Sequence, residues 1–293
     1  MSDDTPLLDA DVVAAFPEYK VKVPRLGEGT FKAAYLASDS QQDFVLKILF
    51  GQTTSSDEEP ALDARFIREI QLMAGLDTLR VASLYKPVSY REVSGSTVAW
   101  YGEPYYSDGS LDSILNDRTL SPSEAWRLTM HLFEGLEALH SQGIIHRDIK
   151  PGNICRTADG DYVILDLGIA HVVSMERLTE TGFQSPMTIS YSAPEQLAIS
   201  RNSLVDGRTD IFAAGIVLFE VISGRHPFVD SPRMSIDDYL ARIDNHVPGQ
   251  LLDYDCHPTL QEVIDRCLAS RQNRRFRNAS QALAKLKEVE TTT

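Results

Sequence analysis

The sequence predicts an α+β fold in two parts, a small β-rich region followed by a larger helical region. Three observations support this prediction. Between residues 19 and 102, short runs alternate apolar and polar side chains, as half-buried strands do. Beyond Asp108-Gly109 the apolar residues recur at helical spacing. Residues 209–224 are apolar on nearly every face, which is typical of a helix at the centre of a domain.

The first part begins with an acidic lead-in, residues 1–18, for which we expect one short helix around residues 9–16. Apolar residues at helical spacing between 64 and 76 predict the main helix of this part, ending near Gly75. Strands are expected at 21–23, on either side of the glycine-bearing segment 27–29, and at 44–50, 86–93 and 97–102.

The second part carries clear helix boundaries. Ser121-Pro-Ser-Glu124 is a capping box with proline at the first helical position, and the helix that it opens continues to about His140, before Gly143. Further helices are expected at 209–224, 235–244, 259–269 and 278–288. Asp159-Gly160 lies between two short apolar runs and predicts a hairpin.

Composition restricts the class of protein. The chain has 293 residues, 43% hydrophobic, enough for one large domain or two lobes. Its net charge of −14 disfavours non-specific binding to nucleic acid or to an anionic membrane. No apolar run approaches the roughly 20 residues of a membrane helix, and the N-terminus lacks a signal-peptide pattern. With three widely spaced cysteines, we expect a cytoplasmic protein; its oligomeric state stays open.

The most informative stretch is His146-Arg-Asp-Ile-Lys-Pro-Gly-Asn153. Folding the following hairpin brings its open ends together, so that Asn153 and Asp166 should lie side by side. Asp148 and Lys150 lie on the loop that leads to the same end. Oxygen ligands in small number are what Mg²⁺ accepts when phosphates complete its shell. The stretch therefore predicts phosphoryl transfer.

The order of these signals resembles the eukaryotic-like serine/threonine protein kinase family, from about residue 20 to 288. The resemblance implies a bilobal fold with a lead-in (1–18), a β-rich N-lobe (19–103), a helical C-lobe (104–288) and a tail (289–293). It also implies ATP and Mg²⁺, with Mn²⁺ as an alternative, and protein serine or threonine hydroxyls as acceptors. The hinge falls within residues 99–106, in a register that the sequence leaves open.

For nucleotide binding, the resemblance implies that Lys47 contacts the α- and β-phosphates and pairs with Glu69. Lys32 stands where the family has its third glycine. The nucleotide-binding set is Gly27, Glu28, Gly29, Val45, Lys47, Glu69 and Asp166.

For catalysis, the resemblance implies that Asp148 orients the attacking hydroxyl and that Lys150 neutralises the transferred phosphoryl. Asn153 and Asp166 would hold the metal, and His146 would support the loop. Leu167 replaces the phenylalanine that the family carries after its metal-binding aspartate.

Structural and regulatory residues follow from the same resemblance. Glu195 would form a buried ion pair with Arg275, with the adjacent Arg274 as an alternative, and Asp210 would bond to the backbone of the catalytic loop. Arg147 would receive a phosphate on the activation segment. Candidate phosphorylation sites are Thr179, Thr181 and Ser185, while Lys150 and Thr188 are typical of the serine/threonine branch although Met187 replaces a family glycine.

Two other readings remain open. A pseudokinase or nucleotide-dependent binding module would explain Lys32 and Leu167, but the retained Lys47, Asp148 and Asp166 argue against it. A small-molecule kinase on the same fold would typically lack the Ala193-Pro-Glu195 segment and its paired arginine.

Overall fold

The chain divides into two compact units. One comprises Met1–Leu76 and Ala82–Tyr105, and the other comprises Asp77–Val81 and Tyr106–Thr293. The computed structural model describes residues 8–28, 32–49, 70, 72, 75–165, 190–197, 205–231, 234–249, 251 and 253–290.

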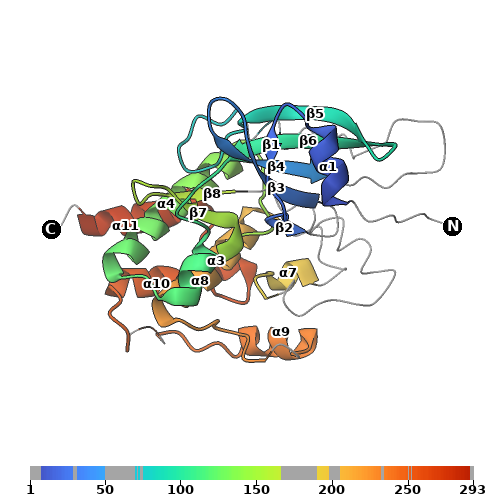
Figure 1. Ribbon diagram of the computed structural model, residues 1–293. Helices are drawn as coiled ribbons and strands as arrows, with labels where there is room; N and C mark the ends of the chain where they lie inside the picture. The colour runs from blue at the N-terminus through green and yellow to red at the C-terminus, as the bar shows by residue number, and fades with distance from the viewer. Residues whose placement is uncertain are drawn as a thin grey trace. The chain divides into compact units, whose positions relative to one another are not determined.

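An antiparallel sheet forms the first unit (Figure 1). Its strand order is β1-β3-β4-β6-β5, and β2 also pairs with β3. The predicted strands are confirmed, while the predicted helix at 64–76 lies mostly outside the described residues. The strands are β1 (Lys20–Val21), β2 (Gly27–Glu28), β3 (Lys32–Ser38), β4 (Asp43–Leu49), β5 (Lys86–Val93) and β6 (Ser96–Pro104).

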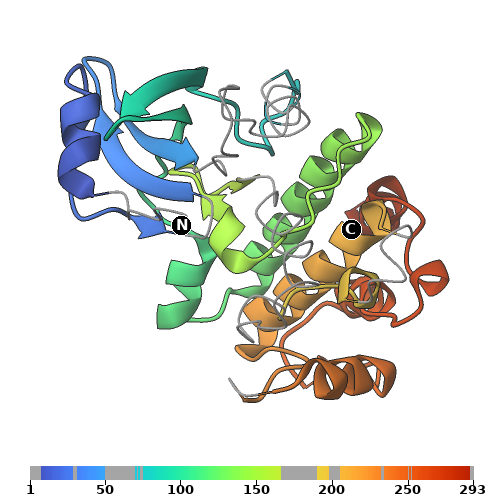
Figure 2. The ribbon, with the colours of Figure 1, turned by 90° about the vertical axis from the view of Figure 1, so that its right-hand side faces the viewer.

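The predicted N-terminal helix is confirmed as α1 (Asp9–Ala15), and it packs on one face of this sheet (Figure 2). Val12 of α1 and Phe16 just beyond it are fully buried in a cluster with inward-facing side chains of β3, β4 and β6. The ring of Phe16 meets that of Trp100 edge to face at 5.2 Å. The lead-in therefore completes the core of the first unit.

Helices and one small hairpin make up the second unit. The predicted helices are confirmed; the short helices α3 and α7 were not predicted. The elements are α3 (Leu111–Asp117), α4 (Pro122–Ser141), the 3₁₀ turn η1 (Pro151–Asn153), β7 (Ile154–Arg156), β8 (Tyr162–Ile164), α7 (Pro194–Leu197), α8 (Gly207–Ser223), α9 (Ile236–Asp244), α10 (Pro258–Cys267), η3 (Gln272–Arg274) and α11 (Ala279–Glu290).

The centre of the second unit is α8, against which α4 and α10 both pack, while α11 lies against α4 and α10 (Figure 1). All residues of α8 from Thr209 to Phe219 are buried, as its apolar sequence predicts. The predicted boundaries of α4 are confirmed. Ser121 and Glu124 form the capping box at its start, and Gly143, just after its end, adopts a positive φ of 72°. Among the described residues, no helix has the length and apolar character needed to cross a membrane.

One segment differs from the predicted division into lobes. Residues 77–81 precede the end of the sheet in sequence but belong to the second unit. The reason is a set of contacts made by the side chain of Arg80 and the backbone of Val81. The guanidinium of Arg80 bonds to Glu134 at 2.8 Å and to Asp161 at 2.7 Å, and Val81 forms a parallel bridge with Ile164.

Candidate functional site

Two side chains of the His146–Asn153 loop converge on the carboxylate of a third, Asp148, in the second unit. The ammonium of Lys150 donates to Oδ2 of Asp148 at 2.7 Å, and Nδ2 of Asn153 donates to the same oxygen at 2.9 Å. Nδ2 of Asn153 also donates to the backbone carbonyl of Asp148 at 2.8 Å. Asn153 is buried, whereas the side chains of Asp148 and Lys150 stay 20% and 41% exposed. The loop therefore presents a carboxylate and a cation to solvent above a buried amide.

His146 is a buried structural residue, as the sequence predicts, and its two partners define its tautomer. Nδ1 accepts the backbone N–H of Asp148 at 3.3 Å, so the ring proton resides on Nε2 and is donated to the carbonyl of Leu165 at 2.8 Å. The imidazole thus connects the loop to the end of β8. Its nitrogens are both engaged, so His146 supports the loop and is not positioned as a base.

Asp210, on α8, holds the loop through its backbone. Its carboxylate accepts the N–H of His146 at 2.8 Å and the N–H of Arg147 at 2.7 Å, as well as Nε2 of His140 at 2.8 Å. Burial opposes ionisation, but the bond from His140 and the other donors outweigh it, and the pKa of Asp210 lies below its usual value. Arg147 has a φ of 67°, a left-handed conformation that is strained for a residue with a side chain. Asp210 therefore stabilises an otherwise unfavourable turn directly before Asp148.

Gln196, on α7, holds the same turn from another side. Its Nε2 donates to the carbonyl of Arg147 at 3.0 Å, and its Oε1 accepts the N–H of Ala193 at 3.0 Å. Gln196 is buried, and both ends of its amide are paired. The segment after Ala193 is thereby connected to the loop that carries Asp148.

The hairpin forms as predicted and brings its open end to Asn153. Ile154 pairs with Ile164, and the backbone N–H of Leu165 donates to the carbonyl of Asn153 at 2.8 Å. Gly160 adopts a positive φ of 79° in the turn. Leu165 is the residue before Asp166, which itself lies outside the described residues.

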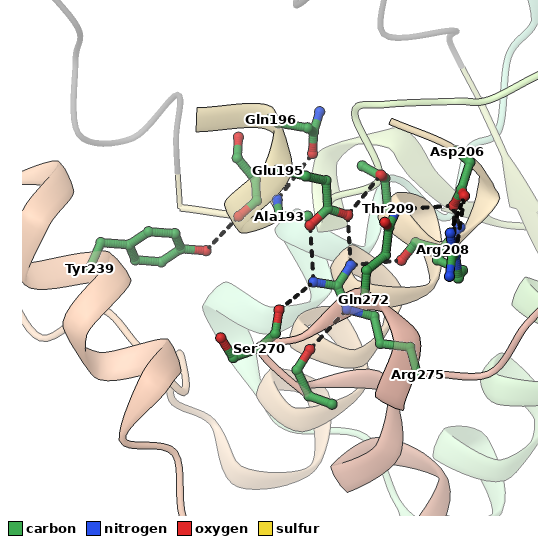
Figure 3. Close-up of polar contacts among 12 residues, drawn as sticks. Ala193, Glu195, Gln196, Asp206, Arg208, Thr209, Tyr239, Ser270, Gln272 and Arg275 are labelled. Carbon is green, nitrogen blue, oxygen red and sulfur yellow. Dashed lines mark hydrogen bonds and ion pairs between the residues drawn. The ribbon is translucent and has the colours of Figure 1, made fainter. Parts of the chain in front are cut away.

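A buried ion pair joins Glu195 of α7 to Arg275 (Figure 3). The arginine binds the carboxylate through both terminal nitrogens, with Nη1 at 2.7 Å from Oε1 and Nη2 at 3.0 Å from Oε2. Arg275 is 2% exposed and Glu195 is 4% exposed. Of the two candidate partners, the adjacent Arg274 is exposed and Arg275 forms the pair.

All five donor positions of the Arg275 guanidinium are used. Besides Glu195, they bond to the carbonyls of Arg208, Ala269 and Ser270 at distances between 2.9 and 3.1 Å. Thr209 donates to Oε1 of Glu195 at 2.9 Å, and the guanidinium lies over the ring of Phe212 at 4.5 Å. Both charges of the pair are therefore compensated by fixed groups.

The segment leading to Ala193 is held by aromatic and imidazole side chains. Nε2 of His226 lies 2.8 Å from the carbonyl of Ser190, a carbonyl that also accepts the hydroxyl of Tyr239 at 2.8 Å. Burial lowers the pKa of His226 to about 4, so this imidazole is neutral at physiological pH. The hydroxyl of Tyr191 donates to Glu220 at 2.6 Å, and burial raises the pKa of that carboxyl group.

In the first unit, the predicted phosphate-binding lysine has a carboxylate partner that the sequence did not indicate. Nζ of Lys47 on β4 lies 2.6 Å from Oε2 of Glu103 on β6, and both side chains are buried. Val45 faces Glu103 in the register of the two strands. Gly27 and Glu28 form β2, where Glu28 pairs with Arg25 at 2.9 Å.

Several predicted residues lie outside the described part of the chain. These are Gly29, Glu69, Asp166, Thr179, Thr181, Ser185 and Thr188. Their predicted roles stay predictions. Among the residues that are described, no group of three or more histidine, cysteine, aspartate or glutamate side chains is arranged to hold a metal.

Sequence reasoning missed Glu103, His140 and Gln196. An available signal for His140 was its position in the last turn of a capped amphipathic helix, next to the buried Leu139. Gln196 directly follows Glu195 and could have been considered with it. Glu103 had no local signal, since its importance depends on which strand lies beside Lys47.

An antiparallel sheet with a buried lysine, followed by a helical unit with an anchored His-Arg-Asp loop, defines a kinase fold. Residues 20–286 match the protein kinase domain family, and the chain belongs to this family. The fold likeness extends to a crystal structure of Rad53 1-466 in complex with AMP-PNP, with a TM-score of 0.70. That alignment covers 92% of this chain and 64% of the Rad53 chain at 20% identity.

Bacterial serine/threonine protein kinases are among the relatives. The chain is 28% identical over 267 residues to PknB of Mycobacterium leprae, covering 90% of this chain and 42% of PknB. It is 31% identical over 255 residues to PknA of Corynebacterium glutamicum, covering 86% of this chain and 52% of PknA. The chain thus spans about half or less of the length of these curated relatives.

Proposed function

We propose that this kinase domain transfers the γ-phosphoryl group of ATP to serine or threonine hydroxyls of proteins, in the cytoplasm. The observation that carries the proposal is the cluster of Asp148, Lys150 and Asn153 on a loop anchored by Asp210. Phosphoryl transfer depends on positioning and on charge compensation more than on covalent chemistry, and this loop supplies both. The names of the relatives agree with the acceptor class.

Within this proposal, Asp148 accepts a hydrogen bond from the attacking hydroxyl and orients it. Lys150, 2.7 Å from that carboxylate and partly exposed, can contact both Asp148 and an incoming phosphoryl oxygen. Its positive charge offsets negative charge that develops on the transferred group. Lys47, in the first unit, would bind the α- and β-phosphates.

The donor set also fits Mg²⁺. Both side-chain hydrogen bonds that Asn153 makes within the described residues use Nδ2, so the side-chain oxygen is the atom that it can offer to a cation. Asp166, directly after the residue bonded to the Asn153 backbone, would add a carboxylate oxygen. Bound there, Mg²⁺ would neutralise phosphate charge, and hard oxygen ligands are those it prefers.

Autophosphorylation of the activation segment is part of the proposal. In the described part of the chain, the buried Nε of Arg147 has no hydrogen-bond partner. A phosphate on Thr179, Thr181 or Ser185 would supply strong acceptor oxygens for such a guanidinium. Mapping phosphosites on the purified wild type and on Asp148→Asn tests this step directly.

The main test is transfer of labelled phosphate from ATP to the protein itself and to generic protein acceptors. Asp148→Asn should reduce transfer by about 10²-fold or more, the usual contribution of a positioned base. Asp159→Asn is the matched control because this exposed carboxylate lies in the hairpin turn, and it should retain full transfer. A wild type that labels no acceptor in a broad library would refute the proposal.

A nucleotide-dependent binding module is the competing function. Thermal unfolding with and without Mg²⁺-ATP separates the two possibilities when it is run beside the transfer assay. A rise in Tm without any transfer would favour the binding module. The buried Glu195–Arg275 pair, together with the Ala193-Pro-Glu195 segment, supports a protein substrate over a small molecule.

A further inference from the structure

The buried pair of Lys47 and Glu103 lies wholly within the sheet of the first unit. Lys47 is 5% exposed and Glu103 is 3% exposed, and 2.6 Å separates their charged atoms. An ammonium buried this deeply without a counter-charge would be costly and would tend to lose its proton. Glu103 provides a counter-charge from the neighbouring strand.

Strand register explains why these two side chains meet. In the pairing of β4 with β6, Lys47 is directly opposite Tyr101 and Val45 is directly opposite Glu103. Residues two apart on a strand share a face, so Lys47 and Glu103 form a diagonal pair on the same face. The intervening Leu46 and Gly102 point to the other face, where α1 packs. Continuous pairing from Phe44 to Leu49 holds both ends of the ion pair in place.

Tyr101 adds a second constraint on the lysine. Nζ of Lys47 lies 5.9 Å from the centroid of the Tyr101 ring, within the range of a cation–π contact. The ammonium is therefore bounded by an aromatic ring on the residue opposite and by a carboxylate on the diagonal. Both come from β6, which is hydrogen-bonded to β4.

We propose that Glu103 is a positioning residue for phosphoryl transfer, keeping the ammonium of Lys47 charged and oriented for the phosphates of ATP. This inference rests on the proposed function. Because Glu103 lies on the strand paired with β4, the register of the sheet sets its distance from Lys47. Removing Glu103 should therefore impair nucleotide use.

The first measurement follows the chemical reactivity of Lys47 and does not depend on catalysis. Acylation of Lys47 by a lysine-reactive reagent is followed by mass spectrometry in wild type, Glu103→Gln and Asp39→Asn. Asp39 is the matched control because its carboxylate lies 2.7 Å from another lysine of the same unit, Lys86. In Glu103→Gln a larger neutral fraction of Lys47 should raise its acylation rate about tenfold, the expected effect of removing one buried counter-charge. Asp39→Asn should leave that rate unchanged.

The second measurement separates KM from kcat in the transfer assay. Glu103→Gln should raise the KM for ATP about tenfold or more, because ATP phosphates then meet a misplaced or neutral lysine. Asp39→Asn should match wild type. Glu103→Asp retains the charge on a shorter side chain, so it should recover part of the loss, and it replaces Glu103→Gln should the latter not fold.

The outcomes distinguish this inference from the proposed function. An active wild type whose KM for ATP is unchanged by Glu103→Gln would overturn the inference, as would an unchanged acylation rate of Lys47. If the wild type transfers no phosphate, the proposed function fails, and the acylation rates still decide whether Glu103 positions Lys47.

Discussion

Replacing Arg275 by methionine is predicted to be among the most destabilising single changes in the second unit. The substitution leaves the carboxylate of Glu195 buried at 4% exposure with Thr209 as its remaining side-chain donor. It also removes donors from three backbone carbonyls. Breaking a buried ion pair from one side costs about 3–5 kcal/mol, a large part of the roughly 5–15 kcal/mol that stabilises a typical domain.

Urea denaturation followed by circular dichroism measures this loss. Arg274→Met is the matched control because the neighbouring arginine is exposed, and surface changes of this kind stay within about 0.5 kcal/mol. Arg275→Lys keeps the charge but cannot bind both carboxylate oxygens in a fixed fork, so an intermediate loss of about 1–3 kcal/mol is expected. A free energy of unfolding for Arg275→Met within about 1 kcal/mol of wild type would refute the reasoning.

Three further changes probe other parts of the second unit. Burial lowers the pKa of His226 from 6.5 to about 4. The contribution of the neutral imidazole to the free energy of unfolding is therefore complete above pH 6.5 and is lost as pH falls toward 4. His226→Gln should flatten the fall in free energy of unfolding over that window by up to about 3 kcal/mol, and an unchanged slope would contradict this. A Cβ at Gly215 would lie 2.7 Å from Cβ of Cys267, so Gly215→Ala should cost about 1–3 kcal/mol in thermal unfolding, against the gain expected of alanine in an open helix. Ser121→Ala removes the capping box of α4 and should cost about 1 kcal/mol in urea, whereas no loss would mean that the cap is replaced by solvent.

Features with a local cause were predictable from the sequence. The Asp159-Gly160 turn needs a positive φ at glycine, and Ser121 and Glu124 cap a helix through bonds between neighbours in sequence. The same is true of the buried helix α8, whose apolar residues leave it no exposed face. In each case the determining contacts lie within a few residues, so a single sequence contains the information.

The partner of Lys47 was not predictable in this way. Pairing Lys47 with Glu103 requires the register of β4 against β6, two strands that are far apart in sequence. A shift of one residue would place Glu103 on the opposite face, against the apolar cluster with α1. The sequence left the register of residues 99–106 open, and so the carboxylate beside the lysine could not be assigned. The role of Gln196 was not predicted for a related reason: its bond to the carbonyl of Arg147 joins residues that are distant in sequence.

The His146–Asn153 loop is held mainly through its backbone. Asp210 on α8 accepts the backbone N–H groups of His146 and Arg147, and Gln196 on α7 donates to the carbonyl of Arg147. Groups on these two helices therefore stabilise the strained turn at Arg147. None of these bonds uses the side chain of Asp148 or Lys150. The helical framework therefore fixes the backbone that carries Asp148 and Lys150. Under the proposed function, little reorganisation of this loop would be needed when charge develops in the transition state. Because His140 bonds to Asp210 from α4, the same framework that stabilises the unit also sets the geometry of the loop.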